Sequence, residues 1–267
     1  MAEPVTVTSP LDPRLEAFTG LNDAAHRDRL ERRLGVFVVE GVTAIERLLT
    51  SPYPVQSLLL SPAKHTRLAP LLAGVVIPVF VAEREVLARV AGFDLHRGAL
   101  AVATRLPLPA PADLLRAAGC VVVGEGWNDH ENLGAIARTA TALGADGLLL
   151  DPASADPLYR RCVRVSMGEI LRLPFTRLDP WPASLGLLRE AGFTVVALTP
   201  ATDALRIDEL APPGRVALLL GAEGPGLSGE ARRAADVSVR IPMRAGVDSL
   251  NLGHAAAIAL HRLARPC

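Results

Sequence analysis

The sequence predicts an α/β protein built from two domains. Short apolar runs alternate with segments of helical periodicity along the whole chain, a pattern typical of a mainly parallel sheet with helices between its strands. The 267 residues suffice for two domains or one large domain. A proline-rich stretch, LPLPAP at 106–111, is typical of a semi-rigid linker. We therefore expect domains over 1–107 and 118–267, with a linker at 108–117.

The N-terminal domain begins with a helix that has clear end signals. Asp23 is the expected N-cap of a helix over Ala24–Leu34, and Gly35 is expected to follow its end. The next apolar run, Val36–Val39, is a predicted strand. Further predicted elements are a helix at about Val42–Leu49, strands at Val55–Leu60, Val75–Val81 and Ala99–Thr104, and helical segments near Ala69 and over Arg84–Val90. These elements make a small α/β domain.

The second domain starts with a buried strand, Cys120–Val123, and a helix with Asn132 as its expected N-cap. Later predicted elements are a strand at Gly147–Leu150, a helix over Leu158–Gly168, strands at Phe193–Leu198 and Val216–Leu220, a strand ending at Ile241 and an Ala-rich helix reaching about Leu263. The last helix carries almost no charge before Arg262, so we expect most of its surface to be buried. Asp248 or Ser249 is its expected cap.

Composition narrows the class of protein. The 28 Lys and Arg residues balance 28 Asp and Glu residues, so no overall field draws the chain to nucleic acid. Lys64 is the sole lysine; the arginine bias fits either a GC-rich genome or contacts with phosphate. Three cysteines without paired spacing argue against disulfides and a zinc site. With no signal peptide and no run long enough to span a membrane, the sequence predicts a cytoplasmic protein.

Three polar stretches carry the candidate chemistry. The first, LLLGAEGPGLS at 218–228, opens a buried strand into three close glycines, which lets backbone approach a ligand. Its G-x-x-G-x-G spacing differs from the dinucleotide fingerprint, and a plain turn would also explain it. Glu223 is unusual there because a carboxylate repels phosphate. It would rather orient a cation, a ribose hydroxyl or an arginine.

The other two stretches are Asn132 with Arg138, and Ser249-Leu250-Asn251. Arg138 is either a solvated surface group or a clamp for phosphate. The second stretch is either a helix cap or a polar step that presents free N–H groups to a ligand. We exclude a metal at Asp129-His130-Glu131, because three successive side chains rarely converge on one ion. His254 and His261 are interpreted as structural.

Taken in order, these motifs resemble the SpoU–TrmH family of S-adenosylmethionine-dependent RNA ribose 2′-O-methyltransferases. The residues that carry the resemblance are Asn132-Leu133-Gly134-Ala135-Ile136-Ala137-Arg138-Thr139-Ala140, the loop 219–228, Ile241-Pro242-Met243 and Ser249-Leu250-Asn251. Arg164–Gly168 looks like a further family patch. The first domain is similar, more loosely, to the family's ribosomal-protein-like substrate-binding domain, through Arg27 and Phe37-Val38-Val39-Glu40-Gly41.

The resemblance implies a parallel-sheet domain whose C-terminal segment forms a trefoil knot, a homodimer, and S-adenosylmethionine bound in the knot without a metal. The donor site carried over from the family comprises Leu198, Thr199, Gly221, Glu223, Gly226, Ile241, Met243, Ser249 and Leu250. The expected catalytic set comprises Arg138, Asn132, Ser249, Asn251 and Glu223, with Arg138 helping to activate the ribose hydroxyl. Two departures from the family pattern are Ala222 in place of a frequent asparagine and Asp129-His130 in place of Asp-Pro.

The predicted substrate is RNA, most naturally ribosomal RNA, because a separate domain bearing Arg27, Arg29, Arg32 and Arg33 could bind a folded stem or loop by shape and phosphate. The same chemistry on transfer RNA is an alternative. A non-catalytic RNA-binding protein with this fold is a second alternative, which the complete set of motif residues disfavours. A nucleotide-dependent oxidoreductase is a third, disfavoured by the missing fingerprint.

Overall fold

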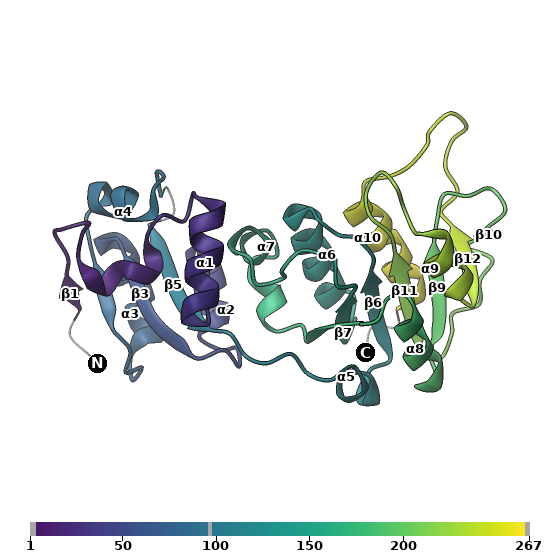
Figure 1. The fold of residues 1–267 in the computed structure, drawn as a ribbon, viewed down its shortest axis with the longest axis horizontal. Helices are drawn as coiled ribbons and strands as arrows, with labels where there is room; N and C mark the ends of the chain where they lie inside the picture. The colour runs from purple at the N-terminus through teal and green to yellow at the C-terminus, as the bar shows by residue number, and fades with distance from the viewer. Residues whose placement is uncertain (1–3, 96–97, 265–267) are drawn as a thin grey trace. The chain divides into compact units, whose positions relative to one another are not determined.

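The computed structural model describes residues 4–95 and 98–264, and the chain divides into two compact units (Figure 1). Unit 1 contains Met1–Leu106 and Leu158–Arg172, and unit 2 contains Pro107–Pro157 and Leu173–Cys267. The first division falls one residue from the expected domain end at 107. The segment 158–172, expected in the second domain, instead belongs to unit 1. The expected domain ends at 1–3 and 265–267 lie outside the described residues.

Unit 1 is built on a mixed five-stranded sheet. Its order is β1 (Val5–Thr6), β4 (Val79–Val81), β3 (Val55–Leu60), β5 (Ala99–Thr104) and β2 (Val36–Glu40). Strands β1, β4 and β3 are parallel, whereas β5 runs antiparallel to both β3 and β2. Strand β4 is shorter than predicted and starts directly after Pro78. Proline lacks the N–H that a ladder needs, which explains the late start.

The helices of unit 1 begin and end largely where their capping signals predict. They are α1 (Ala24–Leu34), α2 (Val42–Leu48), α3 (Pro62–Leu72) and α4 (Arg84–Ala91), preceded by the 3-10 helix η1 (Pro13–Phe18). The Asp23 side chain accepts from the His26 N–H, and Gly35 follows α1 at φ 65°, as predicted. Helix η1 and helix α4 cover one face of the sheet: Phe18 and Leu87 pack there with Leu59 and Val102.

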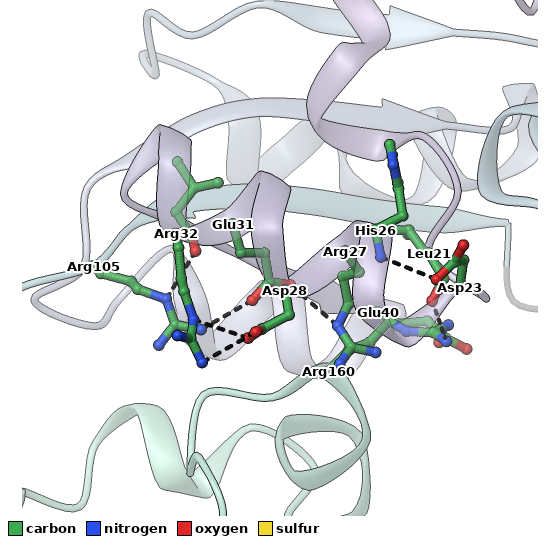
Figure 2. A network of polar contacts seen from close by, with 11 residues as sticks. Leu21, Asp23, His26, Arg27, Asp28, Glu31, Arg32, Glu40, Arg105 and Arg160 are labelled. Atoms are coloured by element: carbon green, nitrogen blue, oxygen red, sulfur yellow. Dashed lines mark hydrogen bonds and ion pairs between the residues drawn. The ribbon is translucent and has the colours of Figure 1, made fainter.

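Unit 1 also holds α7 (Arg160–Val165) and the 3-10 helix η2 (Glu169–Leu171). The helix predicted over Leu158–Gly168 ends early because Met167 and Gly168 both have positive φ, 57° and 87°. Glu40, at the end of β2, is only 5% exposed. Its Oε2 lies 2.7 Å from Nη1 of Arg160 (Figure 2). The segment 158–172 is therefore tied into unit 1 by a buried ion pair.

Unit 2 is built on a seven-stranded sheet in which every described pairing is parallel. Its order is β10 (Leu205–Arg206), β12 (Val237–Arg240), β9 (Thr194–Leu198), β11 (Val216–Leu220), β6 (Cys120–Gly124), β7 (Gly147–Leu150) and β8 (Phe175–Arg177). The prediction of a mainly parallel sheet is confirmed. The sequence analysis missed β8 and β10, which are three and two residues long, too short for an alternating pattern to show.

Helices cover both faces of this sheet. On one face lie α5 (Pro111–Ala117), α8 (Gly186–Glu190) and α9 (Gly229–Ala234), preceded by the 3-10 helix η3 (Ala183–Leu185). On the opposite face α6 (His130–Ala142) and α10 (Leu252–Leu263) pack side by side (Figure 1). Helix α5 replaces most of the predicted linker, with Pro111 at its first position, where proline is well tolerated. None of the described helices is long and apolar enough to cross a bilayer.

The caps of α6 and α10 differ from the predicted ones. Asp129 caps α6, its carboxylate accepting from the Glu131 N–H at 2.7 Å, so Asn132 lies within the first turn. Asn251, rather than Asp248 or Ser249, caps α10. Short polar residues were clustered at both starts, and the pattern could not decide which one adopts the cap conformation. Helix α10 is buried on one side only, because Ile258 is 43% exposed.

The buried pair in unit 1 yields a stability prediction. Replacing Glu40 by alanine leaves the Arg160 guanidinium buried without its carboxylate, so we expect a loss of about 3 kcal/mol in the free energy of unfolding. The double variant Glu40→Ala/Arg160→Met should recover part of that loss. Urea unfolding measures the loss in free energy of unfolding. The fluorescence of the two tyrosines, Tyr53 and Tyr159, reports unit 1, because both tryptophans lie in unit 2.

The matched control is Asp28→Ala, which removes the exposed Asp28–Arg32 pair of the same unit (Figure 2). An exposed pair contributes little, so its unfolding midpoint should stay at the wild-type value. A Glu40→Ala protein as stable as this control would show that the buried pair does not hold the segment 158–172 in place.

Candidate functional site

A pocket lies at the carboxyl ends of the parallel strands of unit 2, where ligands of open α/β sheets bind. It holds about 770 Å³ of space, part of it open to solvent. Strand β9 brings Leu198 to it, β11 brings Leu220, and the chain after β12 brings Ile241. The lining residues are Leu198, Thr199, Pro200, Leu220, Gly221, Ala222, Glu223, Gly224, Gly226, Ile241, Met243, Ser249, Leu250, Leu252 and Ala255.

All the residues expected from the sequence to bind a methyl donor line this one pocket. Sequence analysis missed six lining residues, namely Pro200, Leu220, Ala222, Gly224, Leu252 and Ala255. Most of them adjoin predicted residues in the chain, so the motif boundaries were drawn too narrowly. Ala255 lies one helical turn into α10, and it can be assigned to the pocket only when the direction of that helix is known.

The glycine loop, residues 221–228, folds back on itself beside the pocket. The N–H of Gly226 donates to the carbonyl of Ala222 at 3.0 Å. A Cβ on Gly221 would lie 2.1 Å from the carbonyl carbon of Gly226 and 2.2 Å from the nitrogen of Leu227, so no side chain fits at that position. Gly224 and Gly226 have φ of 90° and 71°, which favour glycine. These requirements explain the G-x-x-G-x-G spacing.

A relay of three polar side chains joins the three motifs. The Asn132 Nδ2 donates to Glu223 Oε2 at 2.7 Å, and the Asn251 Nδ2 donates to Asn132 Oδ1 at 2.9 Å. Asn251 Oδ1 accepts in turn from the N–H groups of Gly253 and His254, at 2.9 and 3.3 Å. Each link fixes the next one. An ionised Glu223 only accepts, so Asn132 turns its amide nitrogen to it, and both asparagine orientations follow.

The relay accounts for most of the predicted catalytic set. Asn132 is 8% exposed, Glu223 and Ser249 line the pocket, and Asn251 connects Asn132 to the start of α10. Arg138 is different. It lies on an exposed position of α6, it is not among the lining residues, and its guanidinium makes no hydrogen bond or ion pair with the described part of the chain.

The four arginines expected to contact RNA lie on α1 of unit 1, and they differ in exposure. Arg29, Arg32 and Arg33 are exposed. Arg27 lies within ion-pair distance of Glu31 (Figure 2), and its side chain is only 12% exposed. Its guanidinium lies 4.0 Å over the ring of Tyr159. The geometry gives Arg27 a packing role between α1 and the segment 158–172. The helical periodicity could not foresee this, because that segment is distant in sequence.

The lining is mainly apolar and fits a neutral or cationic ligand. Leu198, Ile241, Met243 and Leu250 supply apolar walls. Among the described lining residues, Glu223 is the one with an ionisable side chain, which favours a positive charge over a phosphate.

No group of three potential metal ligands occurs among the described residues. Burial, with Asp146 nearby, raises the pKa of the Cys120 thiol to about 12, so this cysteine stays protonated and is no nucleophile.

Comparison with known proteins places this architecture. A family model described as the SpoU rRNA Methylase family matches residues 119–261. An uncharacterised tRNA/rRNA methyltransferase of Mycobacterium tuberculosis is 44% identical over 97% of this chain and 91% of its own length. A 23S rRNA (adenosine(1067)-2′-O)-methyltransferase of Streptomyces laurentii is 35% identical over 84% of this chain and 78% of its own.

Solved structures agree with this placement. The SpoU methyltransferase AviRb of Streptomyces viridochromogenes, in complex with AdoMet, superposes with a TM-score of 0.81 at 26% identity, covering 94% of this chain and 97% of that one. An AdoMet-bound rRNA methyltransferase of Sinorhizobium meliloti gives 0.80 at 27% identity, covering 96% of both. With its parallel sheet, its glycine loop and its linked motifs, the chain belongs to the SpoU rRNA methylase family.

Proposed function

We propose that the protein is an S-adenosylmethionine-dependent methyltransferase that modifies a ribose 2′-hydroxyl of ribosomal RNA. One observation carries the proposal: loops from three distant parts of the sequence converge on one pocket. Two of them, the glycine loop and the segment before α10, are joined through Asn132, which bonds to Glu223 and Asn251. The names of the relatives support the substrate class, since two Streptomyces relatives are 23S rRNA 2′-O-methyltransferases. Two similar structures contain AdoMet.

The pocket of unit 2 is the proposed donor site. The apolar side chains of Leu198, Ile241, Met243 and Leu250 would hold the adenine and ribose by shape, and the backbone around Gly221 and Gly226 would approach the ligand closely. Glu223 and the polar groups of Thr199 and Ser249 would face its charged end. The bound donor supplies a methyl group on a sulfonium, which is already electrophilic and needs no metal.

The remaining chemistry falls to the side chains around the pocket. The relay holds Glu223 and Asn251 in fixed orientations, so the loops bearing them are in place before substrate arrives. Arg138 is the group we assign to the RNA. A guanidinium stays protonated and can bind a phosphate by two N–H groups. From there it would stabilise the negative charge that develops on the ribose oxygen as the proton leaves.

Unit 1 is the proposed RNA-binding unit, with Arg29, Arg32 and Arg33 as its phosphate contacts. Arg32 pairs with Asp28 and Arg33 with Glu16, but all four side chains are more than half exposed. Exposed pairs are weak, so a phosphate can replace the carboxylate. Arg27 stays out of this set because it packs against Tyr159.

Three finer features complete the proposal. A homodimer is supported by the family resemblance and by the exposed apolar side chains Val247 and Ile258 in unit 2, and sedimentation of a single monomeric species would refute it. The family resemblance supports a trefoil knot formed by the C-terminal segment. A crystal structure with an unthreaded C-terminus would refute the knot. An RNA substrate supports a cytoplasmic location, which cell fractionation tests.

Arg138→Ala tests the catalytic assignment. We expect kcat/KM for methyl transfer from labelled S-adenosylmethionine to ribosomal RNA to fall about 100-fold or more. The Kd for the donor should be unchanged, because Arg138 does not line the pocket. The control is Arg233→Ala, an exposed arginine on α9 of the same unit, which should retain wild-type kinetics. Full activity of Arg138→Ala would remove this residue from the mechanism.

The triple variant Arg29→Ala/Arg32→Ala/Arg33→Ala tests the RNA contacts. Loss of three phosphate contacts should weaken RNA binding and make the slope of log K against log salt concentration shallower by about 2. Filter binding over a range of salt concentrations measures both quantities. Donor affinity serves as the internal control and should not change. An unaltered slope would show that this face of α1 does not contact phosphate.

A further inference from the structure

The turn that follows β6, Glu125-Gly126-Trp127, contacts the glycine loop at both ends. At the start of the loop, the carbonyl of Leu220 accepts from the Glu125 backbone N–H at 3.0 Å and from the Trp127 Nε1 at 3.2 Å. At its end, the backbone N–H of Ser228 donates to Glu125 Oε2 at 2.8 Å. This one turn therefore holds both ends of the loop 221–228.

Both oxygens of the Glu125 carboxylate are engaged. While Oε2 holds Ser228, Oε1 accepts from the Trp181 Nε1 at 2.7 Å. A carboxylate only accepts, and its hydrogen bonds to N–H donors are among the stronger ones. Ser228 is also the N-cap of α9, its hydroxyl accepting from the Ala231 N–H at 3.1 Å. Glu125 thus fixes the point at which the loop becomes a helix.

Between these two ends, the loop is held by the Gly226–Ala222 backbone hydrogen bond and by the bond from Asn132 to Glu223. A Cβ added at Gly224 or Gly226 would meet no atom within 4 Å, so the middle of the loop is open on that side. Glycine has the largest backbone freedom of any residue, and ordering it is costly. Glu223, Gly224 and Gly226 line the pocket, so their placement depends on how the two ends are held as well as on the bond from Asn132 to Glu223.

We propose that Glu125 is a positioning residue for the donor pocket. Through Ser228 and Trp181 it holds the loop 221–228 in the conformation that receives S-adenosylmethionine, without touching the donor itself. The inference rests on the proposed function of the pocket. A purely structural tie would lower the stability of unit 2 as a whole, whereas a positioning residue changes donor affinity and local loop order.

The test compares Glu125→Ala and Glu125→Gln with the wild-type protein. Glutamine keeps one acceptor oxygen but places an amide NH₂ against the second N–H donor, so we expect an intermediate effect on donor affinity. It also provides a second variant if Glu125→Ala folds poorly. The control is Glu230→Ala, an exposed carboxylate in the first turn of α9. Calorimetry gives the Kd for S-adenosylmethionine, hydrogen–deuterium exchange of the donor-free protein reports order in 221–228, and tryptophan fluorescence reports the stability of unit 2.

We expect Glu125→Ala to raise the donor Kd about 10- to 100-fold. Exchange should accelerate in 221–228 but not in β6 or β11, and the KM for RNA and the control variant should stay at wild-type values. Wild-type donor affinity and loop exchange in both Glu125 variants would overturn the inference and leave the pocket assignment standing. A uniform rise in exchange across unit 2 would also overturn it. A wild-type protein that binds no donor would overturn the pocket assignment and this inference with it.

Discussion

The hydrogen-bonded chain from Glu223 through Asn132 to Asn251 is the interaction on which the candidate site depends. It joins the glycine loop to the first turn of α6 and to the N-terminus of α10, three segments that are distant in the sequence. Its direction is determined by the carboxylate, because every later donor and acceptor is assigned once Glu223 accepts. The relay also ends at the N-terminus of α10, the positive end of the helix dipole, which favours an anionic group at the other end of the relay.

The parallel sheet explains why the relay from Glu223 to Asn251 can form. All strands of unit 2 point the same way, so the ends of β9, β11 and β12 meet at one edge, and the loops that follow them share one space. Close approach of the helices is also necessary. A Cβ at Gly253 of α10 would lie 3.4 Å from the Cβ of Ala135 of α6, so small residues bring Asn251 and Asn132 within hydrogen-bond distance.

The sequence predicted the strands of the core well, because long apolar runs such as Val55–Leu60 and Val216–Leu220 admit few alternatives. It also grouped nine residues that the structure brings together in the pocket of unit 2, although only through their order and spacing within a family pattern. It failed where several polar residues competed for one position, as at the caps of α6 and α10. It also failed where the outcome depended on contacts between residues distant in the sequence. Two examples are the packing of Arg27 on Tyr159 and the hydrogen bond between Glu125 and Ser228, which no local sequence pattern indicates.

We propose above that the loops after β9, β11 and β12 form the S-adenosylmethionine site. Hydrogen–deuterium exchange of the wild-type protein with and without the donor tests it most directly. We expect slower exchange on donor binding at 198–200, 220–226 and 241–255, with unit 1 unchanged. Protection that instead falls on unit 1, or on the opposite edge of the seven-stranded sheet, would contradict it.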